Sequence, residues 1–559
     1  MICLMKINRI RVPRVEAGSI GYNIMRKSEL KQTRRLNRLV ASLLVGLWAV
    51  TPVWVNALPS GGDIAPGAIS QPTAQDMVIQ QNSQLMITNW QKFSIGAGES
   101  VTFNQPSSSA IALNRVIGVD PSIILGKLSA NGQVFLSNPS GVLFGKSAVV
   151  DVHGLLATTL NISDADFLSG NYQFSQDPNQ SLSAIVNEGV IKAGSYVGLV
   201  APAVVNFGSI IVADLGSVSL SSGTEATLDF NGDGLISFAV SQEVLGDVFD
   251  TNGKNKLKDR INNSGLIRAN GGQVLLTAKS AGKVIGDVVN HSGIIEAQTV
   301  QQKDGKIILS SGDTGTVEIS GTLDAPNVFI TANTVAVAAN NDLSTNNGNM
   351  NILADHLDIK GDLDSGTGDV AFTLANGGDL DIGPGNNPNG GLGSNDIRHI
   401  IAENLIINTN GDINVKGISE KNTAGIKDSV ILNSGWDINF KDANSLFPAL
   451  KLFAINDINV NADITTTKGS FVAVADSENN GKGDFNMAPG VTVTSARDID
   501  ISAVNINAKS TSFSETSNLI LNGSVVGGLQ TPIDTNSVQQ GALGSFLTDF
   551  FQNGGSGGC

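Results

Sequence analysis

The sequence of 559 residues is poor in charged residues, in aromatic residues and in cysteine. Charged residues make up 15% of the chain, against roughly 25% in ordinary soluble proteins. Two cysteines and four histidines leave little room for a disulfide framework or a metal cluster. The formal net charge of −15 argues against a nucleic-acid partner, because holding phosphates requires an excess of Lys and Arg.

Small and aliphatic residues are abundant instead. The chain contains 63 glycines, and its hydrophobic share of 41% includes only 5% aromatic residues. A composition this apolar argues against disorder, and the scarcity of aromatic rings argues against the core of a typical enzyme. We therefore expect a folded chain whose core is built mainly from Val, Ile, Leu and Ala.

Positive charge is concentrated at the N-terminus. Residues 1–40 contain ten basic and two acidic residues, a balance of +8, so the rest of the chain carries −23. The apolar run 39–55 follows, with small residues at Val55 and Ala57. This order is typical of a secretory signal peptide, predicted to span residues 1–57. A transmembrane anchor is the alternative, but the run is short and contains Pro52.

Two further features depend on this leader. Met25 is an alternative start, because the Arg and Lys that follow it already supply a basic N-terminal region. Cleavage after residue 57 removes Cys3 and leaves Cys559 as the single thiol. The exported chain then has no internal disulfide, and Cys559 either links the tail to a partner, forms a dimer or is incidental.

Short apolar segments recur along the chain with turn residues between them. Four of them are visibly alike, and Asn187 and Asn206 within the first two lie 19 residues apart. The four begin at Ile185 (Ile-Val-Asn-Glu-Gly), Val205 (Val-Asn-Phe-Gly), Ile261 (Ile-Asn-Asn-Ser-Gly) and Val289 (Val-Asn-His-Ser-Gly). A looser form places Asp before a strand-like run at Gly411, Trp436, Asn456 and Arg497.

A repeat of this length cannot bury its apolar face alone. Stacking the copies as coils of a right-handed parallel β-helix solves that problem, with aliphatic residues in internal ladders and Asn and Ser at the turns. A β-sandwich or barrel is the competing all-β fold, but neither predicts a repeat that runs over most of the chain. Residues 340–350 and 375–396 are rich in Asn and Gly and are expected to be loops in the stack.

The most distinctive stretch lies before the repeats. It contains Asn89-Trp-Gln-Lys-Phe-Ser-Ile, Ala112-Leu-Asn-Arg-Val-Ile-Gly, and a run from Leu125 to Gly145 that includes Asn138-Pro139-Ser140-Gly141-Val142. This order and spacing resembles the N-terminal secretion domain of two-partner secretion exoproteins, the filamentous-haemagglutinin family, and most of all its high-molecular-weight adhesin branch. The family motif Asn-Pro-Asn-Gly-Ile appears here as residues 138–142, whereas a second motif, Asn-x-Asn-Leu, is not evident.

The resemblance implies a β-helical secretion domain over residues 58–250. It also implies a partner, an outer-membrane β-barrel transporter with periplasmic polypeptide-binding domains that exports the unfolded chain. Residues 251–540 are then the β-helix repeat region and residues 541–559 a tail or cap. A disulfide-free chain that folds coil by coil suits such a route.

The segment Asn138–Val142 is first of all a turn, since Pro139 presets φ and Gly141 tolerates a positive φ. Two interpretations stay open: the turn closes a coil, or it contacts the transporter. Asn114 and Arg115 are weaker candidates for transporter recognition, and Arg115 is favoured as a charge at a coil edge.

Other chemistry finds little support in the sequence. Residues 229–234 match the first half of a calcium loop, but position twelve is Val240, so a turn is the better interpretation. His153, His291, His356 and His399 show no metal spacing, and no cofactor is expected. The pairs Asp362/Asp364 and Asp379/Asp381 leave a β-helical polysaccharide-active enzyme as the alternative function, although Asp recurs beside turns throughout the repeat.

We therefore predict a secreted or surface exoprotein, not an enzyme, that acts as a haemagglutinin-like adhesin. Its expected targets are glycans or proteins of host or neighbouring cells, and no nucleic acid. Sequons at Asn161, Asn262, Asn290 and Asn522 allow glycosylation but are also expected by chance in a chain so rich in Asn and Ser.

Overall fold

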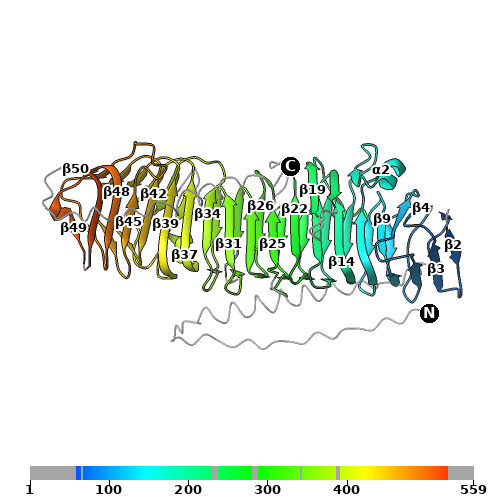
Figure 1. Ribbon diagram of the computed structural model, residues 1–559. Coiled ribbons are helices and arrows are strands. Elements are labelled where there is room, and N and C mark those ends of the chain that lie inside the picture. The colour runs from blue at the N-terminus through cyan, green and yellow to red at the C-terminus, as the bar shows by residue number, and fades with distance from the viewer. Residues whose placement is uncertain are drawn as a thin grey trace, which may run out of the picture. The chain divides into compact units, whose positions relative to one another are not determined.

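The protein is a parallel β-helix in which each coil of the chain hydrogen-bonds to the next (Figure 1). The structure, a computed structural model, describes residues 58–64, 67–229, 237–279, 288–300, 303–339, 343–384, 391–515 and 517–526. The predicted fold class is confirmed. The predicted leader 1–57 with Met25, residues 230–234 of the predicted turn, and the tail 541–559 with Cys559 lie outside the described residues.

The first face of the β-helix is a continuous parallel ladder of strands that runs through nearly every coil. Its strands are β4 (Leu85–Trp90), β6 (Ile111–Val116), β9 (Gln133–Ser137), β11 (Val149–Thr158), β14 (Val190–Ala201), β17 (Ser217–Ser222), β22 (Gln273–Ala278), β25 (Lys306–Ser310), β28 (Asn327–Thr331), β31 (Asn349–Ala354), β34 (Val370–Leu374), β37 (Ile400–Thr409), β39 (Ile426–Ser434), β42 (Leu450–Ala454), β45 (Phe471–Val474), β48 (Ile499–Asn507) and β50 (Leu519–Val526). The ladder crosses residue 250 without interruption, because β17 pairs directly with β22.

The second face has shorter strands and is made in sections. They are β3 (Asp76–Gln81), β5 (Ser100–Asn104), β8 (Lys127–Ala130), the first halves of β11 and β14, β16 (Ser209–Val212), β21 (Leu266–Arg268), β24 (Ile294–Glu296), β27 (Thr322–Asp324), β30 (Leu343–Ser344) and β33 (Leu363–Asp364). A separate parallel sheet in the last coils contains β41 (Ser445–Phe447), β44 (Ile464–Thr466), β47 (Val493–Thr494) and β49 (Phe513–Ser514).

The third face carries most of the repeated segments found in the sequence. Its strands are β7 (Ser122–Ile124), β10 (Val142–Phe144), β13 (Ala184–Asn187), β15 (Ala203–Asn206), β20 (Ile261–Asn263), β23 (Val289–His291), β26 (Thr316–Ile319), β29 (Thr334–Val337), β32 (His356–Ile359), β36 (Gly391–Gly393), β35 (Leu380–Gly383), β38 (Ile413–Val415), β40 (Ile438–Phe440), β43 (Ile458–Val460) and β46 (Phe485–Met487). The four similar segments contribute β13, β15, β20 and β23, which are consecutive members of this ladder.

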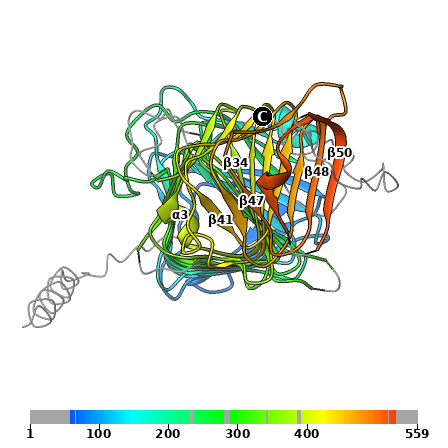
Figure 2. The same ribbon diagram turned by 90° about the vertical axis from the view of Figure 1, so that its left-hand side faces the viewer.

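Alternation of side chains explains why the aliphatic residues stack inside. In β22 every second residue is buried, and the inward Val274 and Leu276 pair with the inward Ile307 and Leu309 of β25. Neighbouring parallel strands lie about 4.8 Å apart, so these side chains form continuous internal ladders. In Figure 2, which looks along the stack, the strands of successive coils surround this common core.

Glycine at one corner of the repeat is required by close approach of the backbone. A Cβ atom on Gly208, Gly265 or Gly293 would lie only 2.1 Å from the carbonyl oxygen of the glycine one coil before it. No side chain fits in that gap, so the glycine that follows each Asn-rich segment allows the coils to stack at strand spacing.

The N-terminal end of the stack is covered by antiparallel pairing. β1 (Asp63–Ile64) pairs with β4, and β2 (Gly67–Ser70) pairs with β3. These pairings satisfy backbone groups that the first coil would otherwise leave open, which protects the edge from pairing with another chain.

Among the described residues, two α-helices and a small antiparallel sheet lie outside the parallel ladders. Helix α2 (Asp164–Ser169) stands beside an antiparallel sheet of β12 (Gln173–Ser175), β18 (Glu225–Asp229) and β19 (Ser237–Gln242) (Figure 1). Helix α3 (Ser394–Arg398) follows β36. In the part of the chain that the structure describes, neither α-helix approaches the length of apolar chain that a bilayer requires.

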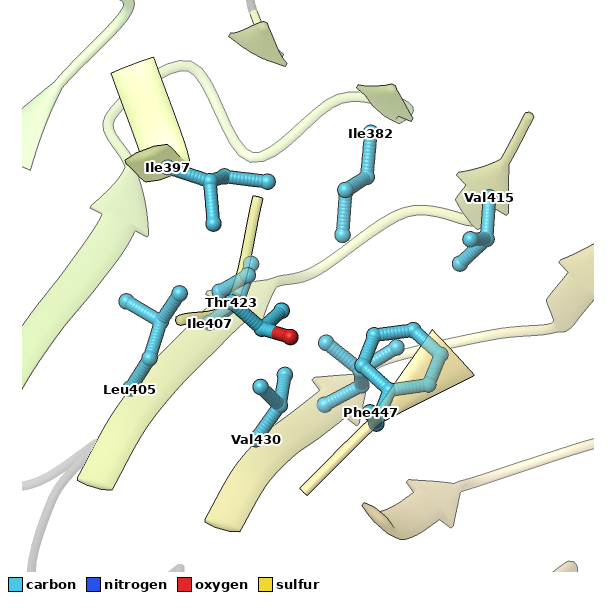
Figure 3. A pocket seen from close by; sticks show the side chains of 9 residues that line it. Ile382, Ile397, Leu405, Ile407, Val415, Thr423, Val430 and Phe447 are labelled. Carbon is cyan, nitrogen blue, oxygen red and sulfur yellow. The ribbon is translucent and has the colours of Figure 1, made fainter. Parts of the chain in front are cut away.

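A small internal cavity of about 10 Å³ lies under α3, where Ile397 points into the core. Figure 3 shows the side-chain oxygen of Thr423 among the aliphatic side chains that surround it, with Phe447 at one side. The volume corresponds to about one water molecule, so the cavity is a packing gap and not a ligand site.

Candidate functional site

The segment Asn138–Val142 forms a tight turn between β9 and β10. The Asn138 carbonyl accepts the N–H of Gly141 at 3.0 Å, and its side-chain Oδ1 accepts the N–H of Ser140 at 2.9 Å. Its Nδ2 donates to the carbonyl of Asp120 at 3.0 Å and to Oγ of Ser122 at 2.9 Å, both in the preceding coil. One amide side chain therefore holds its own turn and joins it to the coil before.

Glycine is needed in this turn because the backbone of Gly141 has φ +104°, in the left-handed region. A Cβ atom there would also lie 3.1 Å from the carbonyl oxygen of Ala184 in the next coil. Pro139 precedes it with the fixed φ that the first central position of a turn uses. Both residue types follow from backbone geometry alone.

The folded turn offers little surface to a partner. Asn138 is 0% exposed, Pro139, Gly141 and Val142 are buried, and only Ser140 reaches solvent in part. A later segment lies across it, since Thr251 approaches within van der Waals distance of the position that a Cβ of Gly141 would occupy. In the folded state the turn is thus a buried connection between two strands of the β-helix.

The covering segment, residues 243–260, which we call the strap, packs on the third face. Val244 and Val248 form a small apolar cluster with Ala184 of β13 and Ala203 of β15. Arg260, 1% exposed, donates from Nη2 to the carbonyl of Gly246 at 2.7 Å. Burial lowers the pKa of Arg260 to about 10, and the charge of Asp247 partly opposes this. The sequence shows no pattern that marks Arg260 as the residue holding the strap.

Asn114 is buried on β6 and serves the coil interior. Its Oδ1 accepts from the indole Nε1 of Trp90 at 3.0 Å, and its Nδ2 donates to the carbonyl of Ala112 at 3.1 Å. Trp90 and Asn114 are both 1% exposed or less, so this pair satisfies two polar groups inside the core.

Arg115, the next residue, points to the outer side of β6. Its Nη2 donates to the carbonyl of Ile162 at 2.7 Å and pairs with the carboxylate of Asp164 at 2.8 Å. Its Nη1 donates to Oδ1 of Asn89 at 3.0 Å. Arg115 therefore ties α2 to the coils, which is more than the edge charge that the sequence suggested.

Helix α2 and the small antiparallel sheet cover an aromatic cluster outside the coil core. Phe135 of β9 has edge-on contacts with Phe167 of α2 and with Tyr172, at centroid distances of 6.2 and 5.7 Å. Ser163 caps the helix by accepting the N–H of Asp166 at 3.0 Å. This cluster, together with the strap, distinguishes the first half of the described chain from the second.

A polar ladder of asparagines lies inside the third face. The sequence pattern predicted that these residues form turns, but they are the last residues of strands β13, β15 and β20. Asn187, Asn206 and Asn263 are each 0% exposed. Asn187 Nδ2 donates to Asn206 Oδ1 at 2.8 Å, and Asn206 Nδ2 donates to Asn263 Oδ1 at 2.7 Å. The spacing of the repeat predicts that Asn187 and Asn206 stack on each other, but it does not show that their side chains point into the core.

His291 ends this ladder. Asn263 Nδ2 lies 3.1 Å from Nδ1 of His291, and Nε2 of His291 lies 3.1 Å from the carbonyl of Thr322. Because a carbonyl only accepts, Nε2 carries the proton and Nδ1 is the acceptor. Burial lowers the pKa of His291 to about 4, so the ring is neutral at physiological pH.

The Asp residues of the later repeats form a second ladder, on the outside. Each accepts the backbone N–H of the Asp in the next coil: Asp379 from Asp412, Asp412 from Asp437, Asp437 from Asp457, and Asp457 from Asp484. The Asp that follows Arg497 is not a member, because its strand β48 pairs with β45 on the first face. Burial, then the neighbouring carboxylates, raise the pKa of Asp412.

The pairs Asp362/Asp364 and Asp379/Asp381 have structural partners. These are His399 Nδ1 for Asp362 at 2.7 Å, the N–H of Gly366 for Asp364 at 2.8 Å, the N–H of Asp412 for Asp379 at 3.0 Å and Lys416 Nζ for Asp381 at 2.6 Å. Among the described residues, no group of three or more His, Cys, Asp and Glu side chains is placed to hold a metal ion.

Comparisons with known proteins identify a family for the N-terminal half of the chain. Residues 56–325 match the family model described as the TPS secretion domain. Two curated relatives, both named Heme/hemopexin-binding protein and both from Haemophilus influenzae, are 31% identical over 287 and 265 residues. These alignments cover 50% and 44% of this chain but only 30% and 27% of the relatives, so the chain spans under a third of their length.

Two solved structures are similar as well. The HMW1 secretion domain from Haemophilus influenzae has a TM-score of 0.41 and 21% identity, and the alignment covers 83% of this chain and all of that one. The filamentous hemagglutinin secretion domain has a TM-score of 0.31 and 12% identity, covering 63% of this chain and 96% of that one.

Proposed function

Residues 56–325 form a two-partner secretion (TPS) domain, and from this premise we propose that a dedicated outer-membrane transporter exports the chain to act outside the cell as a binding protein. The family match carries the proposal. The fold supports it, because coils that contact only their neighbours can form one after another as the chain emerges.

Deleting the gene of the partner transporter tests the export step. The amount of this protein in the culture medium should fall to background, while an unrelated secreted protein stays at its normal level. Unchanged extracellular amounts would show that another route exports the chain and would overturn the proposal.

We propose further that Asn138–Val142 supports export by stabilising its coil and not by presenting a surface to the transporter. The burial of Asn138 and its bonds to Asp120 and Ser122 support this role. Asn138→Ala removes three side-chain hydrogen bonds from a buried site, which we expect to cost about 2–3 kcal/mol of stability and to reduce export several-fold.

Two control variants separate the structural role from recognition. Ser122→Ala lies outside the motif but removes one of the same bonds, so it should reduce stability and export in the same direction. Ser140→Lys changes the one partly exposed residue of the turn and should be exported normally. Normal export of Asn138→Ala, or loss of export in Ser140→Lys alone, would contradict the structural role.

The binding target has two candidates. Adhesion to host or neighbouring cells is favoured by a long, stacked surface with few charges, of the kind that repeat proteins use for binding. Capture of haem or of a haem-carrying protein is favoured by the names of the two curated relatives. Of the histidines in the described chain, His356 is the exposed one, so it is the residue to test as a haem ligand.

Binding assays on the purified secreted protein distinguish haem capture from adhesion. Haem capture predicts a change in the haem absorbance band on titration with hemin, or retention of hemopexin on the immobilised protein, and His356→Ala tests direct ligation. Adhesion predicts attachment of cells to a surface coated with the protein. A positive result in one assay and a negative result in the other decides between the candidates.

A further inference from the structure

A groove of about 340 Å³ lies on the first face, across β28, β31, β34 and β37. It is formed by two columns of outward side chains in register. One column runs through Phe329, Asn351 and Ala371, and the other through Leu353, Thr373 and Asn408. Ala371 makes the hollow, because it is far smaller than its neighbours in the column and is only 7% exposed between them.

The lining of the groove contains no ionisable side chain. It offers an aromatic ring, aliphatic groups, and the polar side chains of Asn351, Thr373 and Asn410, whereas Asn408 is only 5% exposed and its Oδ1 accepts from Asn433. Thr373 Oγ accepts from Asn408 Nδ2 at 3.1 Å, which fixes the Asn408 side chain at the groove wall. Such a lining suits a ligand that combines apolar faces with many hydroxyl groups and carries no charge.

The Phe329 ring is held in position from the preceding coil. Lys306 Nζ lies 5.3 Å from the ring centroid. Lys306 belongs to β25, the strand before β28, so its cation lies beside the Phe329 end of the groove. Phe329 pairs with Asn351 of β31, the strand toward which the groove extends.

We infer that this groove binds a short, neutral oligosaccharide. The C–H face of a sugar ring packs on the aromatic ring and Leu353, and its hydroxyls exchange hydrogen bonds with Asn and Thr. The four coils span about 14 Å at the ~4.8 Å strand spacing, which accommodates a few sugar rings along the stack. A charged ligand is disfavoured, because no lining side chain is ionisable, the nearby Lys306 cation is engaged by the Phe329 ring, and the protein carries a net charge of −15.

The groove lies outside the TPS secretion domain. Its residues fall between 329 and 410, beyond the end of the family match at residue 325. The inference rests on the proposed extracellular binding role and gives it a ligand class. Export is measured separately, as the amount in the medium, so failure of glycan binding and failure of secretion can be told apart.

The test uses the full-length secreted protein on a printed array of neutral and acidic oligosaccharides, with affinities then measured by titration calorimetry for the glycans retained. We expect binding to neutral members. Phe329→Ala should weaken it by about tenfold, the loss of one aromatic contact. Ala371→Trp, which fills the hollow from the outer side of the strand, should abolish it.

Trp436→Ala is the matched control, since Trp436 is 58% exposed, lies outside the groove and should bind like the wild type. Thermal unfolding of each variant checks that the coils remain intact. Retention of acidic glycans only, or of none, would overturn the inference, as would binding that Ala371→Trp leaves unchanged. Hemin binding or self-association that Ala371→Trp removes would assign the groove to a different occupant and overturn it as well.

Discussion

Asparagine ladders occur in two regions of the third face, and the two are built in opposite ways. The upstream ladder points into the core and is fully buried; its members are Asn187, Asn206, Asn263 and the terminal His291. The downstream ladder points outward, and all its members except the buried Asn439 are partly exposed; they are Asn414, Asn439, Asn459, Asn486 and Asn507.

The two ladders differ in the position of the Asn within its strand, which changes by one residue. In β20 the inward third residue is Asn263, whereas in β38 it is Val415 and the Asn is the outward middle residue. Because side chains alternate along a strand, one step changes a surface amide into a core amide. The upstream coils therefore have a ladder of amides in the core where the downstream coils have aliphatic side chains. This buried ladder is stable only while every amide in it has its hydrogen-bond partners.

The largest effect is expected from breaking the buried ladder in its middle. Asn206→Leu leaves the Nδ2 of Asn187 and the Oδ1 of Asn263 without partners in the core. We expect a loss of about 3–4 kcal/mol in the free energy of unfolding, measured by urea denaturation of the purified protein. A loss below about 1 kcal/mol would show that the upstream ladder is no more demanding than the downstream one.

Acid should weaken the upstream ladder through His291. Its pKa is about 4 in the folded protein and about 6.5 when unfolded, so the unfolded state binds the proton first as pH falls. The contribution of His291 to stability is thus fully present above about pH 6.5 and decreases by about 3 kcal/mol as the pH falls to 4. Unfolding titrations across this range measure it.

His291→Asn is the matched variant for that measurement. It continues the amide ladder without a titrating group, and its stability should lack the component assigned to His291 between pH 6.5 and 4. If the pH dependence of the variant equals that of the wild type, other groups are responsible and the ladder does not carry the effect.

The smallest effect is expected downstream. Asn459→Ala removes the bonds to Asn439 and Asn486, both at 3.0 Å, but water can replace them at this partly exposed position. We expect a cost of about 0.5–1 kcal/mol by the same denaturation assay. If Asn459→Ala lowered the free energy of unfolding as much as Asn206→Leu, the upstream and downstream ladders would not differ in their contribution to stability.

Much of the fold was predictable from local pattern. The alternating aliphatic residues, the corner glycines such as Gly265 and the near-regular spacing of Asn187 and Asn206 predicted stacked coils, and the structure confirms them. The residues of the Asn138–Val142 turn were also identified, together with the geometry that Pro139 and Gly141 impose.

The remainder depended on contacts between distant residues. Nothing near residue 138 in the sequence indicates that the strap, about a hundred residues later, covers the turn. Arg115 looked like an edge charge because its partner Asp164 belongs to a helix outside the coils. The Asp after Arg497 resembled the other Asp repeats, yet its strand joined another face, because coil lengths vary and shift the register of the later coils.

By itself the sequence determined the class of fold, because that follows from periodicity and composition. The tertiary structure alone decided which Asn residues face the core, which turn is buried and where an uncharged groove opens. The physical reason is that a strand of three residues does not show by itself which of its two sides faces the core. Only the coils above and below it, and the excursions that cover them, settle that choice.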